Sequence, residues 1–151
     1  MLEKLLREDR VILDMKAKTK EEALKELLQP LHLDPEKEEI VYDALLKRES
    51  IGSTGIGKGI AIPHSRSLVL DQVALVVGRS KQGVDFDALD KKPVYLFFLL
   101  LAPPQDPGTL YLITLGKIAH VARKLSRRKD FMDIEDPKEF VEYIRKLLEE
   151  E

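Results

Sequence analysis

The stretch VYLFFLLLA, residues 94–102, is the most apolar run of the chain. Pro93 precedes this run, and Pro103 and Pro104 follow it. A membrane-spanning helix needs roughly 20 residues, so the run is too short to cross a bilayer. A short continuous apolar segment between turn residues is typical of a strand that is buried on both faces. We therefore expect residues 94–102 to form the central strand of a sheet.

Amphipathic helices and short strands alternate on both sides of this run. Thr19 and Glu22 have the spacing of a capping box at a helix start, and Pro30 should end that helix. Three further helices are expected. One begins at Asp34 and Pro35, one covers residues 109–127, and one begins at Pro137. The side chains expected to face inward are Ile40, Val41, Ala44 and Leu45 on the first of these helices, and Phe140, Val141, Ile144 and Leu147 on the last. Short strands are expected at residues 11–15, 60–62 and 73–77, a glycine-rich loop at 50–59, and turn and edge structure at 81–90. This alternation predicts an α/β domain in which helices cover a sheet.

Composition excludes several classes of function. The chain has 151 residues, enough for one domain with a hydrophobic core, and a net charge of −2, which argues against a dedicated nucleic-acid binder. It has no cysteine, so disulfides, thiolate metal sites and cysteine nucleophiles are excluded. The first residues, MLEKLLREDR, lack the apolar core of a signal peptide. We expect a cytoplasmic protein with no membrane insertion.

The chemistry is expected in residues 48–66, RESIGSTGIGKGIAIPHSR. Its four closely spaced glycines allow positive φ and close approach of the backbone to a ligand, and exposed amides can form an anion-binding concavity. Ser53 and Thr54 add hydroxyl donors, and Arg48 could bind a phosphate through its guanidinium fork. His64 follows a proline at the end of a short expected strand.

A nucleotide-binding P-loop is one interpretation of this segment, because residues 52–58 match the pattern G-x-x-x-x-G-K. The next residue should be Ser or Thr to bind Mg²⁺, and it is Gly59. The preceding residues are helical in pattern, where a strand is required. Both the ligand and the context therefore fail.

A phosphoryl-accepting histidine is the second interpretation. A neutral imidazole is a good nucleophile near pH 7, and Arg48, the hydroxyls and the loop amides would neutralise charge on the incoming group. This arrangement requires no metal and no cofactor. The alternative from the residues alone is a hydrogen-bonded structural histidine beside an ordinary loop.

The segment from Arg48-Glu49 through GSTGIGKGIAIPH, residues 52–64, resembles the active-site motif of type-2 (fructose/mannitol) IIA domains of the bacterial sugar phosphotransferase system. It is most similar to the nitrogen-regulatory IIA proteins. Weaker likenesses lie at residues 84–94, 99–103 and 112–119, so the resemblance extends over most of the chain. It implies a single domain over residues 1–151 in three layers, a mixed sheet flanked by helices on both faces as in mannitol IIA.

The resemblance also implies the roles of the site residues. His64 would be phosphorylated, through Nε2 by analogy, and an HPr-like phosphocarrier would be the donor. Arg48 would neutralise the phosphate, while Ser53, Thr54, Gly55 and Gly57 would shape the pocket. Downstream, the family offers either a IIB domain of a sugar transporter or regulated partners such as kinases and potassium transporters. A non-catalytic sensor or adaptor with the same fold is a further alternative.

One departure from the family pattern concerns the second histidine that many members carry at the start of the long helix. Tyr111 occupies that position here and could donate a hydrogen bond but not carry positive charge. His120 is half a helical turn out of phase with Tyr111, so we expect it to face away, and His32 is expected to be structural. Ile51, Ile56 and Ile60 are candidates for an apolar docking rim. The helix dipole explains most of the basic cluster near a helix C-terminus, and a surface for an anionic partner is the alternative. The cluster comprises Arg123, Lys124, Arg127, Arg128 and Lys129.

Overall fold

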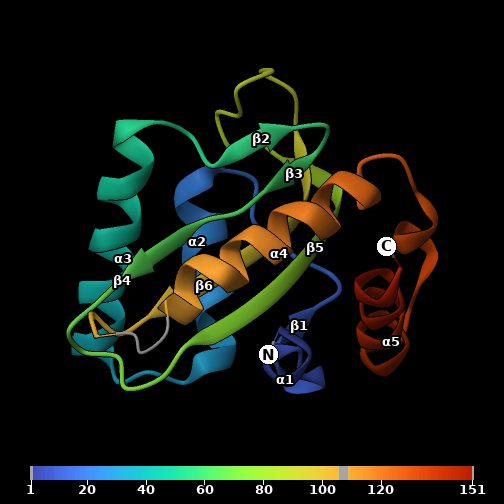
Figure 1. Ribbon diagram of the computed structural model, residues 1–151. Helices are drawn as coiled ribbons and strands as arrows, with labels where there is room; N and C mark the ends of the chain where they lie inside the picture. Colours follow the sequence, from blue (N-terminus) through green and yellow to red (C-terminus); the bar gives the residue numbers. More distant parts are fainter. Residues whose placement is uncertain (1, 106–108, 151) are drawn as a thin grey trace.

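The protein folds into three layers in the computed structural model, which describes residues 2–105 and 109–150 (Figure 1). The helices are α1 (Leu2–Leu5), α2 (Lys20–Leu28), α3 (Pro35–Ile51), α4 (Leu110–Leu125) and α5 (Pro137–Glu149), and short 3-10 helices are η1 (Glu8–Arg10), η2 (Gln29–Leu31) and η4 (Asp130–Asp133). The strands are β1 (Val11–Ile12), β2 (Gly55–Gly57), β3 (Ile60–Ala61), β4 (His64–Arg66), β5 (Ala74–Val84) and β6 (Val94–Ala102).

The mixed sheet is built around β6, as the apolar run predicted. Its strands lie in the order β1-β5-β6-β3-β2, and β4 also pairs with β6. Strand β5 is antiparallel to β6, whereas β3 and β4 are parallel to it. Strands β3 and β4 therefore pair with successive parts of the same edge of β6, and His64 lies opposite Leu100.

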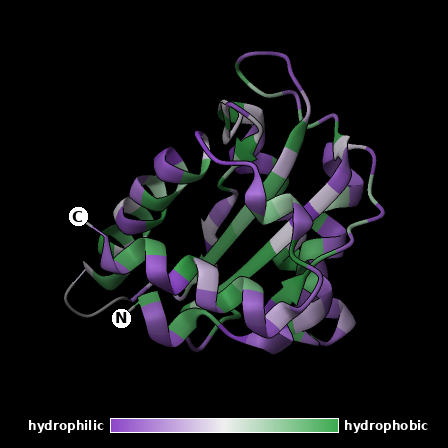
Figure 2. Cartoon of the chain, turned by 90° about the vertical axis from the view of Figure 1, so that its right-hand side faces the viewer, coloured by the Kyte–Doolittle hydropathy of each residue, from purple (hydrophilic) through white to green (hydrophobic). Residues whose placement is uncertain are grey.

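The two faces of the sheet carry separate hydrophobic clusters. Side chains of β6 alternate between them, because successive residues of a strand point to opposite faces. Leu96, Phe98 and Leu100 pack with α1, α4 and α5, while Phe97 and Leu99 pack with α2 and α3. Figure 2 shows these central strands as largely hydrophobic. The predicted three-layer α/β domain is confirmed.

Local sequence signals place the helix starts. Thr19 accepts from the amide of Glu22, whose side chain in turn accepts from the amide of Thr19, so the capping box is confirmed. Asp34 and Asp136 cap α3 and α5, each followed by a proline that has no amide hydrogen to satisfy. The four residues predicted to face inward on α5 are all buried.

Other predictions were wrong in extent. Strand β5 continues to Val84 through an irregularity after Arg79, so it runs beyond the expected strand at 73–77 into the segment expected as turn and edge structure. The inward face of α3 is narrower than predicted: Val41 and Leu45 are buried, but Ile40 is 50% exposed. Helix α4 ends at Leu125. No helix in the described ranges is long and apolar enough to cross a membrane.

Candidate functional site

His64 is the first residue of β4 and is partly exposed. Its Nδ1 lies 2.7 Å from the carbonyl oxygen of Ile62. A carbonyl oxygen only accepts, so Nδ1 carries the proton and donates it. The lone pair of the neutral ring is therefore on Nε2. The backbone two residues earlier thus fixes both the tautomer and the orientation of the imidazole.

Tyr111, in the first turn of α4, packs beside this ring. The ring centroids of His64 and Tyr111 are 6.2 Å apart with the planes tilted by 53°. Burial raises the pKa of the Tyr111 phenol to about 12, although the positive charges of Arg66 and Arg48 act in the opposite direction. The phenol is therefore neutral at physiological pH and keeps its O–H as a donor.

Arg66 is a site residue that the sequence analysis missed. Its Cζ lies 4.7 Å from the centre of the Tyr111 ring, a cation–π distance, and its Nη1 donates to the carbonyl of Pro104 at 3.2 Å. Arg66 is two residues after His64 in β4, and residues i and i+2 of a strand share a face. That spacing was the signal that could have identified it.

Arg48 approaches the same place from the last turn of α3. Its Nη1 donates to the carbonyl of Gly52 at 2.9 Å, which also satisfies a carbonyl just beyond the helix end. The positive charge of Arg48, like that of Arg66, acts to lower the pKa of the Tyr111 phenol. Helix α3 packs against β4, and Tyr111 packs beside His64. A shared role of Arg48 with His64 stays a prediction.

Ser53 and Thr54 hold the chain between α3 and β2 in place. The buried carboxylate of Glu49 accepts from the Thr54 amide at 3.0 Å and, through a second short hydrogen bond, from the Thr54 hydroxyl. Ser53 Oγ accepts from the Gly55 amide at 3.0 Å and donates its hydrogen to the carbonyl of Phe86 at 3.5 Å. The hydrogen of each of these groups is used inside the protein, so the geometry favours a role in shaping the segment over direct contact with a phosphate.

The glycines form a β-hairpin, which corrects the expectation that residues 50–59 are a loop. Helix α3 reaches Ile51, and β2 pairs antiparallel with β3. The turn residues Lys58 and Gly59 have φ of 57° and 82°, the positive values that a type I′ turn requires. Gly55 is needed for close packing, because a Cβ there would lie 2.8 Å from Cβ of Ala88.

The other candidates have mixed outcomes. His120 is exposed while Tyr111 is buried, so the predicted difference in helix phase is confirmed. His32 is exposed and has a positive φ of 51° at the end of η2. Ile51 and Ile56 are exposed at 79% and 47%, but Ile60 is 1% exposed in the core and cannot belong to a docking rim. No group of three or more potential metal-ligating side chains is present in residues 2–105 and 109–150.

Comparison with known proteins now identifies the family. Residues 4–147 match the family described as "Phosphoenolpyruvate-dependent sugar phosphotransferase system, EIIA 2". The chain belongs to this family. The match spans every strand of the sheet, all of α2, α3 and α4, the second half of α1 and α5 up to Leu147.

Relatives of this type-2 IIA chain include both regulatory and transport proteins. A nitrogen regulatory protein from Bradyrhizobium diazoefficiens is 36% identical over 123 residues, covering 77% of this chain and 80% of the relative. A fructose-specific EIIABC component from Bacillus subtilis is 31% identical over 93% of this chain, which spans only 22% of that protein. Among solved structures, nitrogen regulatory protein IIA-Ntr from Neisseria meningitidis superposes with a TM-score of 0.72 at 30% identity, covering 97% of this chain and 98% of that one.

Proposed function

We propose that this type-2 IIA domain is a phosphocarrier that takes a phosphoryl group onto Nε2 of His64 from an HPr-like phosphocarrier protein. The observation that carries the proposal is the hydrogen bond between Nδ1 of His64 and the carbonyl of Ile62. It keeps the proton on Nδ1 and leaves the Nε2 lone pair as the nucleophile.

No proton leaves the site during the phosphoryl transfer. Nε2 of His64 attacks the phosphorus of the donor phosphohistidine, so one N–P bond forms as the other breaks. The electron pair of the broken bond returns to the donor imidazole. Nδ1 of His64 keeps its hydrogen throughout, donated to Ile62, and the carbonyl stabilises the positive charge that develops on the ring.

The neighbours of His64 supply charge and shape. Arg48 and Arg66 would bind the phosphoryl oxygens, where negative charge is spread during transfer. Tyr111 would donate one hydrogen bond as a neutral phenol. Ser53, Thr54, Gly55 and Gly57 would shape the adjoining hairpin rather than touch the phosphate.

The test is phosphorylation of the purified chain by phosphoenolpyruvate, enzyme I and an HPr-like carrier. Intact-mass spectrometry should detect one acid-labile phosphate on the wild type and none on His64→Ala. His120→Ala is the matched control, since it removes the exposed histidine on α4, and should be labelled like the wild type. Labelling that persists in His64→Ala would contradict the assignment, and no labelling of the wild type by any carrier would favour a sensor or adaptor without catalysis.

Regulation of partner proteins, such as kinases or potassium transporters, is the downstream role that we favour. The nitrogen regulatory relatives support it, and so does Tyr111, which supplies no second ionisable imidazole to the site. A sugar-transport role is the second candidate, favoured by the likeness to a fructose-specific component over nearly the whole chain. Transfer of labelled phosphate to the cysteine of a IIB domain would distinguish them, because only the transport role requires it.

A further inference from the structure

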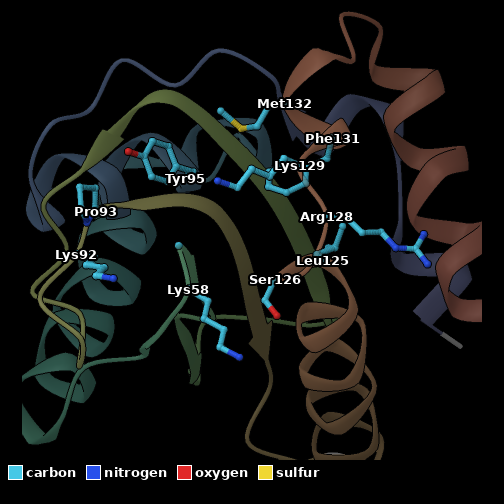
Figure 3. A pocket seen from close by; sticks show the side chains of 11 residues that line it. Lys58, Lys92, Pro93, Tyr95, Leu125, Ser126, Arg128, Lys129, Phe131 and Met132 are labelled. Atoms are coloured by element: carbon cyan, nitrogen blue, oxygen red, sulfur yellow. The ribbon is translucent and has the colours of Figure 1, made fainter.

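A cavity of about 550 Å³ lies at the opposite end of α4 from Tyr111. It is formed by the β2–β3 turn, the segment that leads into β6, the end of α4 and the start of η4 (Figure 3). Its volume is in the range of sites for small organic ligands. Leu125 lines it, and at 1.5 Å per residue the 14 residues from Tyr111 to Leu125 place it about 21 Å along the helix from the His64 site.

Lysine residues from three separate segments line this cavity. Lys58 comes from the hairpin turn, Lys92 from the segment before β6, and Lys129 from the segment after α4. None of the three ammonium groups forms an ion pair within 4.0 Å with any residue that the structure describes. Among the residues that the structure describes, no acidic side chain lines the cavity. Like charges gathered in this way repel one another unless an anion lies between them.

The helix dipole explains only part of this charge. Lys124 donates to the carbonyls of Leu147 and Glu150, and so caps the end of α5. Arg128 pairs with Glu150 at 3.1 Å, and its guanidinium points away from the cavity in Figure 3. These two residues have structural roles. Lys58 and Lys92 do not lie on α4, so its dipole does not account for them.

The carboxylate of Asp90 binds the backbone of two lysine segments, and its charge also interacts with that of Lys92. Asp90 accepts from the amides of Lys58 at 3.0 Å and Lys92 at 3.1 Å. These bonds hold the hairpin turn and the segment before β6 together, so the backbone positions of two of the three lysines are fixed. Asp130, beside Lys129, accepts from the hydroxyl of Tyr143 at 2.6 Å.

One wall of the cavity is apolar and carries an aromatic ring. Tyr95 is half-buried there, beside Pro93 and Met132. Its ring is held at both edges by glycines, since a Cβ on Gly59 or Gly83 would lie 3.3 Å or 3.1 Å from a ring carbon. In Figure 3 the ammonium of Lys129 extends towards this ring. The cavity therefore offers an apolar wall that fits a flat apolar group and, next to it, lysine side chains that attract a multiply charged anion.

From this arrangement we propose that the cavity binds a nucleoside di- or triphosphate, with the base against Tyr95 and Met132 and the phosphates among Lys58, Lys92 and Lys129. Three cations from three segments match more than one phosphate group. The apolar wall distinguishes such a ligand from an inorganic anion. This site is separate from His64 and does not depend on the function proposed for it.

The test is an NMR titration of the full-length, ¹⁵N-labelled chain with ATP at low ionic strength, followed by the same titration with pyrophosphate and with adenosine. Saturable shifts are expected at the amides of Lys58, Gly59, Tyr95 and Lys129. Pyrophosphate and adenosine should each bind at least about tenfold more weakly than ATP, because each offers one half of the interaction. Added salt should weaken ATP binding through screening.

Matched charge variants make the test specific. Lys92→Gln with Lys129→Gln should raise the dissociation constant for ATP about tenfold or more. The control variant, Lys37→Gln with Lys47→Gln, removes the same amount of charge from the exposed surface of α3. Its dissociation constant for ATP should equal that of the wild type. His64→Ala should bind ATP like the wild type.

Three results would overturn the proposal. Shifts that never saturate, or that are weakened equally by both lysine pairs, would show only diffuse attraction to the surface. Equal affinity for pyrophosphate and ATP would show a plain anion site and exclude the nucleotide. Loss of ATP binding in His64→Ala would place the ligand at the other end of α4.

Discussion

The two ends of α4 use positive charge in different ways. At its start, Arg48 and Arg66 each donate to a backbone carbonyl, of Gly52 and Pro104, and Arg66 also stacks over Tyr111. At its end, Lys58, Lys92 and Lys129 surround a cavity without ion pairs among the described residues. The first set is fixed by the protein before any phosphate arrives, and the second is free to adjust.

This difference follows the demands of the two proposed roles. Transfer between two imidazoles needs donors fixed where charge develops, because reorganisation during the reaction would raise the barrier. Planar guanidinium groups with spare N–H donors meet that need. Binding needs only attraction, which flexible ammonium groups supply. The predictions that follow test this contrast from the largest expected effect to the smallest.

Removing either guanidinium at the start of α4 should have the largest effect. Arg48→Ala and Arg66→Ala should each slow phosphorylation of His64 on the order of 100-fold, because each removes a fixed donor to the phosphoryl oxygens. The measurement is the single-turnover rate from a phosphorylated HPr-like carrier. Lys47→Ala, which removes an exposed charge next to Arg48, is the control and should react at the wild-type rate. A comparable loss in Lys47→Ala would show that general charge attraction, rather than fixed donors, drives transfer.

Glu49 should stabilise the folded protein through its hydrogen bonds to Thr54. Glu49→Leu leaves the buried amide and hydroxyl of Thr54 without an acceptor, so the free energy of unfolding should fall by about 1–3 kcal/mol in urea denaturation. Adding Thr54→Val should recover part of the loss, since the hydroxyl is then absent as well. Strictly additive losses in the double variant would contradict the pairing.

Tyr111→Phe should have a smaller effect on transfer. It removes one neutral donor but keeps the ring beside His64 and under Arg66, so the single-turnover rate should fall about 2- to 10-fold. The loss should be the same from pH 6 to pH 8, because the phenol pKa is about 12. A loss that varied across this range would indicate that Tyr111 acts by titrating.

The fold was predictable from the sequence wherever one local signal was sufficient. The apolar run at residues 94–102 identified the central strand, and Thr19, Asp34 and Pro137 indicated where three helices begin. The pairing of strands was not predictable from such local signals. Strand β5 extends to Val84 because it pairs with β6, and no local pattern in a segment of polar residues shows that pairing.

For the candidate site, the sequence indicated residues but not their hydrogen bonds. The roles of His64 and Arg48 stay predictions, whereas Ser53, Thr54 and the glycines were expected to offer donors to a ligand. The fold uses those donors itself, because Glu49 is buried beneath the segment and the glycines form a hairpin. Arg66 was missed because residues 64–66 were not recognised as a strand, although their alternation puts Arg66 on the His64 face.

The smallest expected effect belongs to Asp90, at the cavity end. Hydrogen bonds from the amides of Lys58 and Lys92 lower the pKa of this carboxyl below its usual value. A lowered pKa in the folded state means that the ionised carboxylate stabilises the fold above its unfolded pKa, and that this contribution is lost as the pH falls through the folded value. Asp90→Ala should therefore lower the melting temperature at pH 7 by about 1–3 °C. The difference in melting temperature from the wild type should narrow below about pH 4, which thermal denaturation at a series of pH values would show.

The control is Asp71→Ala, which removes an exposed carboxylate elsewhere on the surface. A difference that is constant with pH would mean that the carboxylate charge does not hold the two lysine segments together, and the fixed frame proposed for the cavity would lose its support.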